Sequence, residues 1–283
     1  MKRVLITGAN SYIGTSFENW VKENNRDFIV DTVDMIGEVW KEKDFGGYDA
    51  VFHVAGIVHQ KKNAVPDETY YKVNCDLVID VAKKAKDAGV RQFVFLSTMS
   101  VYGILTGYID EKTVEHPTNA YGMSKLKAEK ELKQMASEQF LVAIVRPPMI
   151  YGKGCKGNFV SLRKLAIKCP IFPQVDNKRS MLYIENLNLF VGQVIEQEKS
   201  GLFLPQDAQW VSTWDMVRLI RKENGKKLLG IKVFNPIIRM LQKKIAIFQK
   251  VWGSLCYARE LSLIEGMNYQ KYSLEEAIQE IEN

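Results

Sequence analysis

Short apolar runs alternate with helical patterns through the first half of this chain, and this alternation constrains its fold more than any other feature. Each run is β-rich, and most are followed by a stretch with apolar residues at helical spacing. The runs cover residues 3–6, 28–33, 50–54, 92–96 and 142–145, and the main helical stretches cover 12–22, 69–88 and 121–137. Because strands that alternate with helices pair in parallel, we expect an α/β fold with a doubly wound parallel sheet.

Two parts of the chain depart from this pattern. The region between Val33 and Asp49 is too short for a full strand and helix, so we expect an abbreviated element there. After Pro148 a stretch rich in glycine and proline interrupts the alternation, and helical segments return near 184–197 and 213–224. We therefore expect a first domain over 1–150, to which 180–198 returns, and a small mixed lobe formed by 151–179 and 199–283.

The composition is that of an ordinary globular chain, with 46% hydrophobic and 25% charged residues. No run of about 18 apolar residues appears, and Val4–Ile6 is too short for the apolar core of a signal peptide, so we expect a cytoplasmic protein. The three histidines have no metal-ligand spacing, and the cysteines include no C-x-x-C pair. We therefore expect no metal site and reduced thiols at Cys75, Cys155, Cys169 and Cys256.

The net charge of +6 is concentrated in one segment. Between Arg221 and Lys250, nine basic residues stand against one acid, Glu223. A basic lobe of this kind suits a polyanionic small molecule or an anionic membrane surface, and no nucleic-acid-binding motif accompanies it.

Within this basic segment, Asn235 and Pro236 form an N-cap and first-turn pair that predicts a single helix. Its apolar face comprises Ile237, Leu241, Ile245, Phe248 and Trp252. We expect this face to pack on the lobe and the basic face to be solvated. Contact of residues 236–252 with a membrane surface is the alternative.

A glycine-containing loop follows the first strand. Gly8 allows a tight turn and Gly14 allows close packing of helix on strand, as a loop that binds a dinucleotide pyrophosphate requires. Ser11 replaces the middle glycine of G-x-x-G-x-x-G, so its side chain either crowds the phosphate or hydrogen-bonds to it. After the next strand, Asp34 is placed to bind a ribose 2′-OH and to repel a 2′-phosphate, which favours NAD over NADP. Asp31 is the competing candidate.

Tyr121 and Lys125 are four residues apart, so they lie on one face of a helix. We expect the lysine charge to favour the phenolate and so to lower the pKa of Tyr121 toward the range of an acid or base catalyst. The run 92–96 leads into Ser97 and Thr98, which can bring a hydroxyl to the same pocket. Together these groups predict proton transfer at a substrate oxygen as hydride moves.

These motifs together resemble the extended short-chain dehydrogenases/reductases that act on nucleotide sugars. The matching segments follow the family's order over nearly the whole chain: TGANSYIG (7–14), VFHVAG (51–56), STMSVYG (97–103), YGMSK (121–125), VRPPMIYG (145–152) and RSMLYIENL (179–187). The resemblance implies a Rossmann-like sheet, a C-terminal substrate-binding lobe, NAD or NADP as cofactor and a UDP-sugar as substrate. It also implies a homodimer formed through residues 69–88 and 121–137.

The resemblance assigns roles to individual residues. Tyr121 is the acid/base, Lys125 binds the ribose and modifies the pKa of Tyr121, and the active-site hydroxyl is that of Thr98. The substrate contacts come from Ser100, Asn158 and Arg179. The cofactor-binding set comprises Gly8, Asn10, Ser11, Tyr12, Ile13, Gly14, Asp34, Val54, Ala55, Gly56, Asn74, Tyr121, Lys125 and Pro148.

The residues that follow Thr98 separate the reactions of this family. Met99 and Ser100 stand where a 4,6-dehydratase has an Asp-Glu pair, so we expect no dehydratase. The resemblance of the downstream segments favours a bacterial reductase that acts on the 4-keto group of a UDP-4-keto-6-deoxy-hexosamine in capsule or other polysaccharide synthesis. A UDP-hexose or UDP-N-acetylhexosamine 4-epimerase is the alternative, and a non-catalytic NAD(P)-binding regulator is a third hypothesis.

Overall fold

A parallel sheet forms the centre of the first of two units in this structure. The computed structural model describes residues 1–24, 27–58 and 65–283. The first unit comprises 1–103, 114–147 and 188–204, and the second comprises 104–113, 148–187 and 205–283. The assignment of a cofactor domain and a substrate lobe to parts of the chain stays a prediction.

Six strands of the described chain make this sheet: β1 (Lys2–Thr7), β2 (Phe28–Val33), β3 (Ala50–His53), β4 (Gln92–Leu96), β6 (Leu141–Val145) and β10 (Gly201–Phe203). They are all parallel, in the order β10-β6-β4-β3-β1-β2. The expected α/β class and parallel sheet are confirmed. Each strand expected from an apolar run lies within one residue of its predicted limits, whereas the three-residue strand β10 was not expected.

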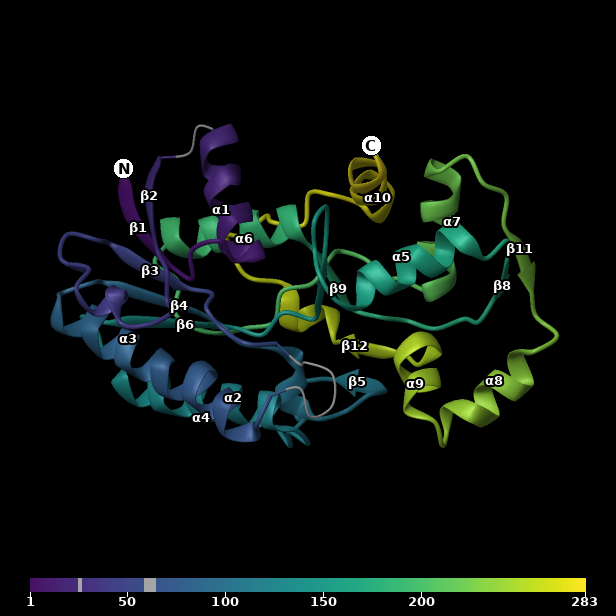
Figure 1. Ribbon diagram of the computed structural model, residues 1–283, viewed down its shortest axis with the longest axis horizontal. Helices are drawn as coiled ribbons and strands as arrows, with labels where there is room; N and C mark the ends of the chain where they lie inside the picture. The colour runs from purple at the N-terminus through teal and green to yellow at the C-terminus, as the bar shows by residue number, and fades with distance from the viewer. Residues whose placement is uncertain (25–26, 59–64) are drawn as a thin grey trace. The chain divides into compact units, whose positions relative to one another are not determined.

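Helices cover both faces of this sheet (Figure 1). Because the pleat points successive side chains to opposite faces, a strand covered on both sides must be apolar throughout. Leu5 and Phe93 belong to one apolar cluster with Val78, whereas Phe52 faces the other side and contacts Phe17, with ring centroids 5.5 Å apart. The covering helices are α1 (Tyr12–Glu23) and α6 (Ile184–Glu196) on one face, and α2 (Asp67–Tyr71), α3 (Leu77–Asp87) and α4 (Ala120–Met135) on the other.

Two elements of the first unit differ from regular helices. The short region after β2 contains only a 3₁₀ turn, η1 (Val39–Lys41), as the sequence predicts, and its buried Trp40 and Phe45 belong to the apolar cluster of this unit. The single helix expected over 69–88 is divided by a π-helical turn, η2 (Lys72–Asp76), between α2 and α3. Such a turn widens the helix locally and changes which side chains point inward.

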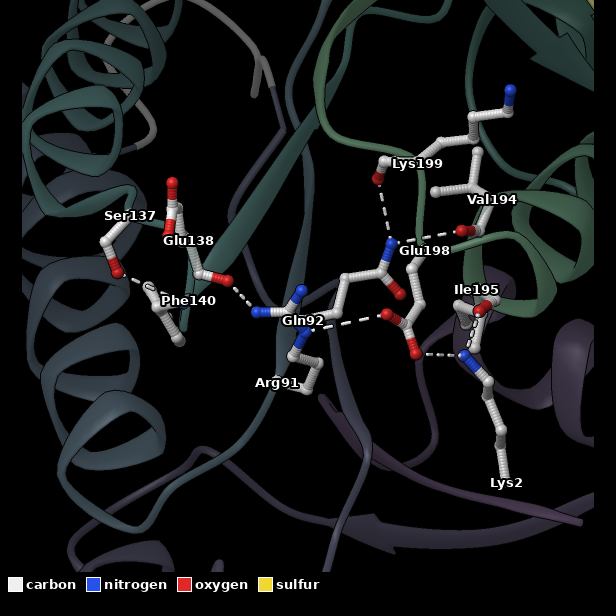
Figure 2. Close-up of polar contacts among 10 residues, drawn as sticks. All are labelled: Lys2, Arg91, Gln92, Ser137, Glu138, Phe140, Val194, Ile195, Glu198 and Lys199. Atoms are coloured by element: carbon white, nitrogen blue, oxygen red, sulfur yellow. Dashed lines mark hydrogen bonds and ion pairs between the residues drawn. The ribbon is translucent and has the colours of Figure 1, made fainter.

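The segment after α6 is tied to the start of the sheet by side chains from distant parts of the sequence (Figure 2). The Gln92 amide donates hydrogen bonds to the carbonyls of Val194 (3.0 Å) and Lys199 (2.8 Å). Lys2 Nζ lies 2.8 Å from Glu198 Oε1 and also donates to the Ile195 carbonyl. These contacts lead the chain into β10, which adds the last strand at the edge beside β6.

The second unit is a set of helices with three small parallel sheets. The sheets pair β11 (Leu229–Ile231) with β8 (Ile171–Pro173), β12 (Leu255–Tyr257) with β5 (Gly107–Ile109), and β7 (Met149–Tyr151) with β9 (Met181–Tyr183). Its helices are α5 (Asn158–Lys168), α7 (Thr213–Glu223), α8 (Asn235–Gln242), α9 (Ala246–Trp252) and α10 (Leu274–Glu282), with the 3₁₀ turn η4 (Arg259–Ser262). No helix among the described residues has the length and apolar character needed to cross a membrane.

The prediction of one helix from Pro236 to Trp252 is wrong. The chain forms two short helices, α8 and α9, separated at residues 243–245, where Ile245 has an extended backbone. Ile237, expected in the packed face, is 51% exposed, and Ile238 is the buried residue of α8 instead. Because the break interrupts the helical repeat, the apolar residues of α8 and α9 do not lie on one continuous helix face.

Candidate active site

The loops after β1 and β3 meet at the carboxyl edge of the sheet. Gly8 N–H donates to the Val33 carbonyl (2.9 Å), and the N–H groups of Val54 and Ala55 donate to the Thr7 carbonyl (3.1 and 3.0 Å). Gly8 has φ +125°, and a Cβ there would lie 2.8 Å from the backbone nitrogen of Ala55. Glycine is therefore required at this position. The strand order reverses beside β1, which is where open α/β sheets bind ligands.

Ser11 acts as the N-cap of α1. Its backbone is extended, and its hydroxyl accepts a hydrogen bond from Gly14 N–H at 3.1 Å. The hydroxyl is thus bound to the first turn of its own helix. The serine that replaces the middle glycine therefore stabilises the start of α1. Tyr12 and Ile13 open α1, and Asn10 precedes the cap with φ +61°. The first-turn N–H groups of a helix and its dipole together favour a bound anion.

The two candidate ribose-binding carboxylates lie in different surroundings. Asp31 lies inside β2, where its carboxylate accepts a hydrogen bond from Tyr48 (2.6 Å) and lies 3.5 Å from Arg3. Asp34 lies just after β2 and follows Val33, whose carbonyl accepts the hydrogen bond from Gly8 N–H. Its carboxylate accepts a hydrogen bond from Ile36 N–H (2.9 Å). Of the two, Asp34 is at the ligand-binding edge.

Asn74 is fully buried in the π-helical turn and holds the loop that follows β3. Its amide accepts from Ile57 N–H (2.9 Å) and donates to the Ile57 carbonyl (3.0 Å). A Cβ on Gly56 would lie 2.9 Å from Asn74 Oδ1 and 3.3 Å from Lys125 Nζ. The absence of a side chain at Gly56 therefore allows the loop, the amide and the ammonium to converge.

Thr98 caps the 3₁₀ turn η3 (Met99–Tyr102) and contacts Tyr121. Its hydroxyl oxygen accepts a hydrogen bond from Ser100 N–H at 3.1 Å, which leaves the hydroxyl proton to be donated elsewhere. Burial raises the pKa of Tyr121 above its usual value, and a hydrogen bond with Thr98 opposes this rise. The two side chains thus form a linked donor pair at the end of β4.

The lysine of the predicted pair does not act on Tyr121 as expected. Lys125 is buried, its ammonium donates to the Leu96 carbonyl (2.9 Å), and it lies 4.6 Å from the Phe95 ring centroid. Burial lowers the pKa of Lys125 to about 8, and the nearby Glu129 charge opposes this shift. The expected lowering of the Tyr121 pKa is wrong for the protein alone, because burial of the phenol outweighs the other influences on it.

A buried ion pair that the sequence patterns did not suggest lies behind these groups. Glu129, on α4 one turn after Lys125, accepts hydrogen bonds from Arg146 and from the Ser97 hydroxyl. Arg146 also donates to Tyr102 (2.8 Å) and to Glu115 (2.8 Å). The periodicity of α4 places Lys125 and Glu129 on one face, and this spacing was the only sequence signal for the network.

Three of the predicted site residues belong to the second unit. Pro148 begins its second segment, Asn158 is the exposed first residue of α5, and Arg179 is half-buried. Arg179 donates to the Gly253 carbonyl (2.9 Å), and burial lowers its pKa. Among the described residues, no carboxylate lies within ion-pair distance of Arg179. A half-buried cation without an acidic partner can receive an anionic ligand.

Comparison with known sequences identifies a family and a close relative. The family model described as "NAD dependent epimerase/dehydratase family" matches residues 4–202. A protein of Vibrio cholerae named UDP-glucose 4-epimerase is 32% identical over 244 residues, which cover 77% of this chain and 74% of that protein.

Two solved structures share the fold over nearly the full length. UDP-N-acetylglucosamine 4-epimerase from Bacillus cereus has a TM-score of 0.76 at 18% identity, covering 100% of this chain and 98% of its own. A dTDP-4-dehydrorhamnose reductase from Bacillus anthracis, in complex with NADP, has a TM-score of 0.74 at 21% identity, covering 99% and 98%. An epimerase and a reductase are thus similar to this chain to nearly the same degree.

Proposed function

The chain belongs to the NAD-dependent epimerase/dehydratase family, and from this premise we propose that it transfers hydride at C4 of a nucleotide-activated hexose. The observation that carries the proposal is the pairing of the Tyr121 phenol with the Thr98 hydroxyl at the end of β4. Such a pair can bind one substrate oxygen and exchange a proton with it, which is the protein's share of a hydride transfer at a carbinol carbon.

The residues at the carboxyl edge of the sheet fit a dinucleotide cofactor. The close approach at Gly8 leaves room for a pyrophosphate, and the first turn of α1 at Tyr12 and Ile13 offers N–H groups to it. Asp34 suits an adenosine ribose, and Lys125 beside Gly56 suits the second ribose. When bound, NAD(P) supplies or accepts the hydride, and Asp34 favours NAD.

Tyr121 can donate its phenolic proton to a ketone oxygen as hydride reaches the carbon, which is the proton transfer that a reduction requires. We propose that the chain is a reductase of the 4-keto group of a UDP-4-keto-6-deoxy-hexosamine, because the segments 145–152 and 179–187 resemble those of such reductases. Met99 and Ser100 supply no carboxylate for the elimination that a dehydratase performs.

A second candidate function is a 4-epimerase. It is supported by the Vibrio cholerae relative, which is named UDP-glucose 4-epimerase. The same Tyr121 and Thr98 would then take a proton from the C4 hydroxyl and return it after the ketone has turned over in the site.

The substrate diphosphate is assigned to Arg179. Its half-buried guanidinium is held by the Gly253 carbonyl, and it has no carboxylate partner among the described residues, which suits two phosphate groups. Asn158 at the start of α5 and Ser100 in η3 are proposed as further substrate contacts. A homodimer formed through α2–α3 and α4 stays a prediction.

One experiment separates these activities. Purified protein is incubated with a UDP-4-keto-6-deoxy-hexosamine and either NADH or NADPH, and the absorbance of the reduced nicotinamide is followed. In parallel, UDP-GlcNAc and UDP-glucose are each incubated without added cofactor and resolved by chromatography from their C4 epimers. Loss of absorbance with formation of the 4-hydroxy product supports the reductase, and interconversion of epimers without net oxidation supports the epimerase. Turnover in neither assay would contradict the proposed hydride transfer.

A further inference from the structure

The region from residue 224 to residue 259 in the second unit contains basic residues but no acid. The sequence has no Asp or Glu between Glu223 and Glu260. We define the basic apolar surface as residues 232–250, which begin three residues before α8 and include most of α9. Its exposed basic residues are Lys232, Arg239, Lys243, Lys244 and Lys250. Within the described chain, none of these five has an ion-pair partner within 4.0 Å.

Large apolar side chains are exposed on the same surface. Ile237 is 51% exposed, Met240 is 60% exposed and Ile247 is 60% exposed, and Val233 and Phe234 precede α8 with similar exposure. Single exposed apolar residues are ordinary, but with Ile245, which is 39% exposed, there are six within fifteen residues among unpaired cations. Of the residues named here, Ile237 belongs to the face that was expected to pack on the lobe, and its exposure contradicts that expectation.

A hollow in this surface combines both kinds of side chain. Its volume is about 530 Å³, and it is lined by Lys232, Asn235, Pro236, Arg239, Met240 and Lys243. A lining that combines three cations with Pro236 and Met240 suits a phosphate group attached to a hydrocarbon chain, because the cations can bind the phosphate while the apolar side chains contact the chain.

We propose that the basic apolar surface docks the protein on an anionic phospholipid bilayer. Lys232, Arg239 and Lys243 bind lipid phosphates, and the side chains of Phe234, Ile237 and Met240 enter the boundary between headgroups and acyl chains. Cations alone would give a weak and fully salt-sensitive attachment, and apolar burial alone would not select anionic lipid. The combination predicts a reversible peripheral attachment that needs both anionic lipid and exposed apolar side chains. This inference does not depend on the proposed reaction.

Vesicle co-sedimentation tests the proposal with the full chain. We expect binding to phosphatidylcholine vesicles that contain about 30% phosphatidylglycerol, because this fraction of anionic lipid gives a strong negative surface potential. Binding to vesicles of phosphatidylcholine alone should be much weaker. Binding should weaken as salt is raised, because added salt shortens the range of the attraction. Equal binding to both vesicle types, or binding to neither, would overturn the proposal.

Two variants identify the parts of the surface. Removal of three charges in Arg239→Gln/Lys243→Gln/Lys244→Gln should weaken binding to the anionic vesicles about 100-fold, at about fivefold per cation near a membrane. The matched control is Lys164→Gln/Lys168→Gln/Lys271→Gln, which removes the same charge from exposed positions of the second unit outside this surface. The control should bind like the natural chain, and an equal loss in both triple variants would overturn the assignment to this surface.

The apolar contribution is tested by Ile237→Ser/Met240→Ser. Both side chains are more than half exposed, so the variant should keep the melting temperature of the natural chain. We expect it to retain binding in low salt and to lose most binding near physiological salt, where electrostatic attraction alone is weak. Unchanged binding at physiological salt would show that the apolar side chains do not enter the bilayer, and would overturn that part of the proposal.

Discussion

Glu129 and Arg146 form an ion pair in which both side chains are fully buried and Arg146 Nη2 lies 2.6 Å from Glu129 Oε2. The pair connects α4, which carries Tyr121 and Lys125, to the end of β6. Because Glu129 also accepts from Ser97, next to Thr98, one carboxylate joins the two elements that carry the proposed donor pair. We infer that Glu129 is a positioning residue and that it acts through Ser97.

Replacement of Glu129 by Gln should strongly destabilise the protein. It removes the buried carboxylate that pairs with the buried Arg146 charge, and loss of one member of a buried pair costs about 3–5 kcal/mol. Urea unfolding measures the change in the free energy of unfolding. The matched control is Glu115→Gln, which removes the half-exposed partner and should cost about 1 kcal/mol or less. Equal losses for the two variants would contradict a central role for Glu129.

Replacement of Tyr121 by Phe should remove turnover without removing the cofactor. The variant keeps the ring but loses the proton donor, so we expect kcat to fall by about 10²–10⁴ and the Kd for NADH, measured by fluorescence, to change little. Thr98→Val should lower kcat as well, whereas Thr98→Ser, which keeps the hydroxyl, should recover most of the activity. A Tyr121→Phe variant with nearly normal turnover would exclude the proposed acid.

The buried Lys125 should make stability rise with pH above neutrality. Burial lowers the pKa of Lys125 from 10.5 to about 8, so between these values the unfolded chain binds a proton that the folded chain does not. The free energy of unfolding should therefore increase as pH rises from about 8 toward 10.5, and the cost of the buried charge is fully present below about pH 8.

The variant Lys125→Met isolates this effect. It removes the titrating group, so its free energy of unfolding, measured by urea titration at a series of pH values, should vary less over the same window. Lys127→Met, on the same helix but exposed, is the control and should keep the pH dependence of the natural chain. If Lys125→Met shows the full dependence, another group is responsible.

Replacement of Asp34 by Ala should reduce the preference for NADH over NADPH. The substitution removes a carboxylate that would bind the ribose and repel a 2′-phosphate, and hydrogen bonds to charged groups contribute about 1.5–3 kcal/mol, or about 10–100-fold in Kd. Fluorescence titration with both cofactors measures the ratio. Asp31→Ala is the matched control: it removes the contact with Tyr48 inside β2 and should leave the ratio unchanged.

Much of the architecture could be predicted because its signals are local. The limits of β2 and β4 follow from runs of apolar residues that a buried strand requires, and both were predicted without error. The family was predicted from six short motifs and is confirmed, as is its nature as an NAD(P)-dependent enzyme family. The roles of Thr98, Tyr121 and Lys125 were also predicted from motifs, and they stay predictions until the variants above are measured.

Other features depend on contacts between residues far apart in the sequence. The π-helical turn at Asn74 exists where a buried amide holds the backbone of Ile57, and no helical periodicity indicates it. The division of α8 from α9 likewise has no glycine or internal proline to mark it. The π-helical turn and the division of α8 from α9 depend on which polar groups find hydrogen-bond partners and which apolar side chains are buried. Those partners are brought together only when the chain folds.

The sequence by itself determined the alternation of strands and helices in the first half of the chain, the glycine loop and the family, because apolar periodicity and short motifs act over a few residues. The tertiary structure alone decided the pKa values of the groups in the candidate site. It buried Lys125 against the Leu96 carbonyl and raised the pKa of Tyr121, which reverses the expected effect of the pair. The physical reason is that a pKa depends on desolvation as much as on neighbouring charges, and desolvation is a property of the packed molecule.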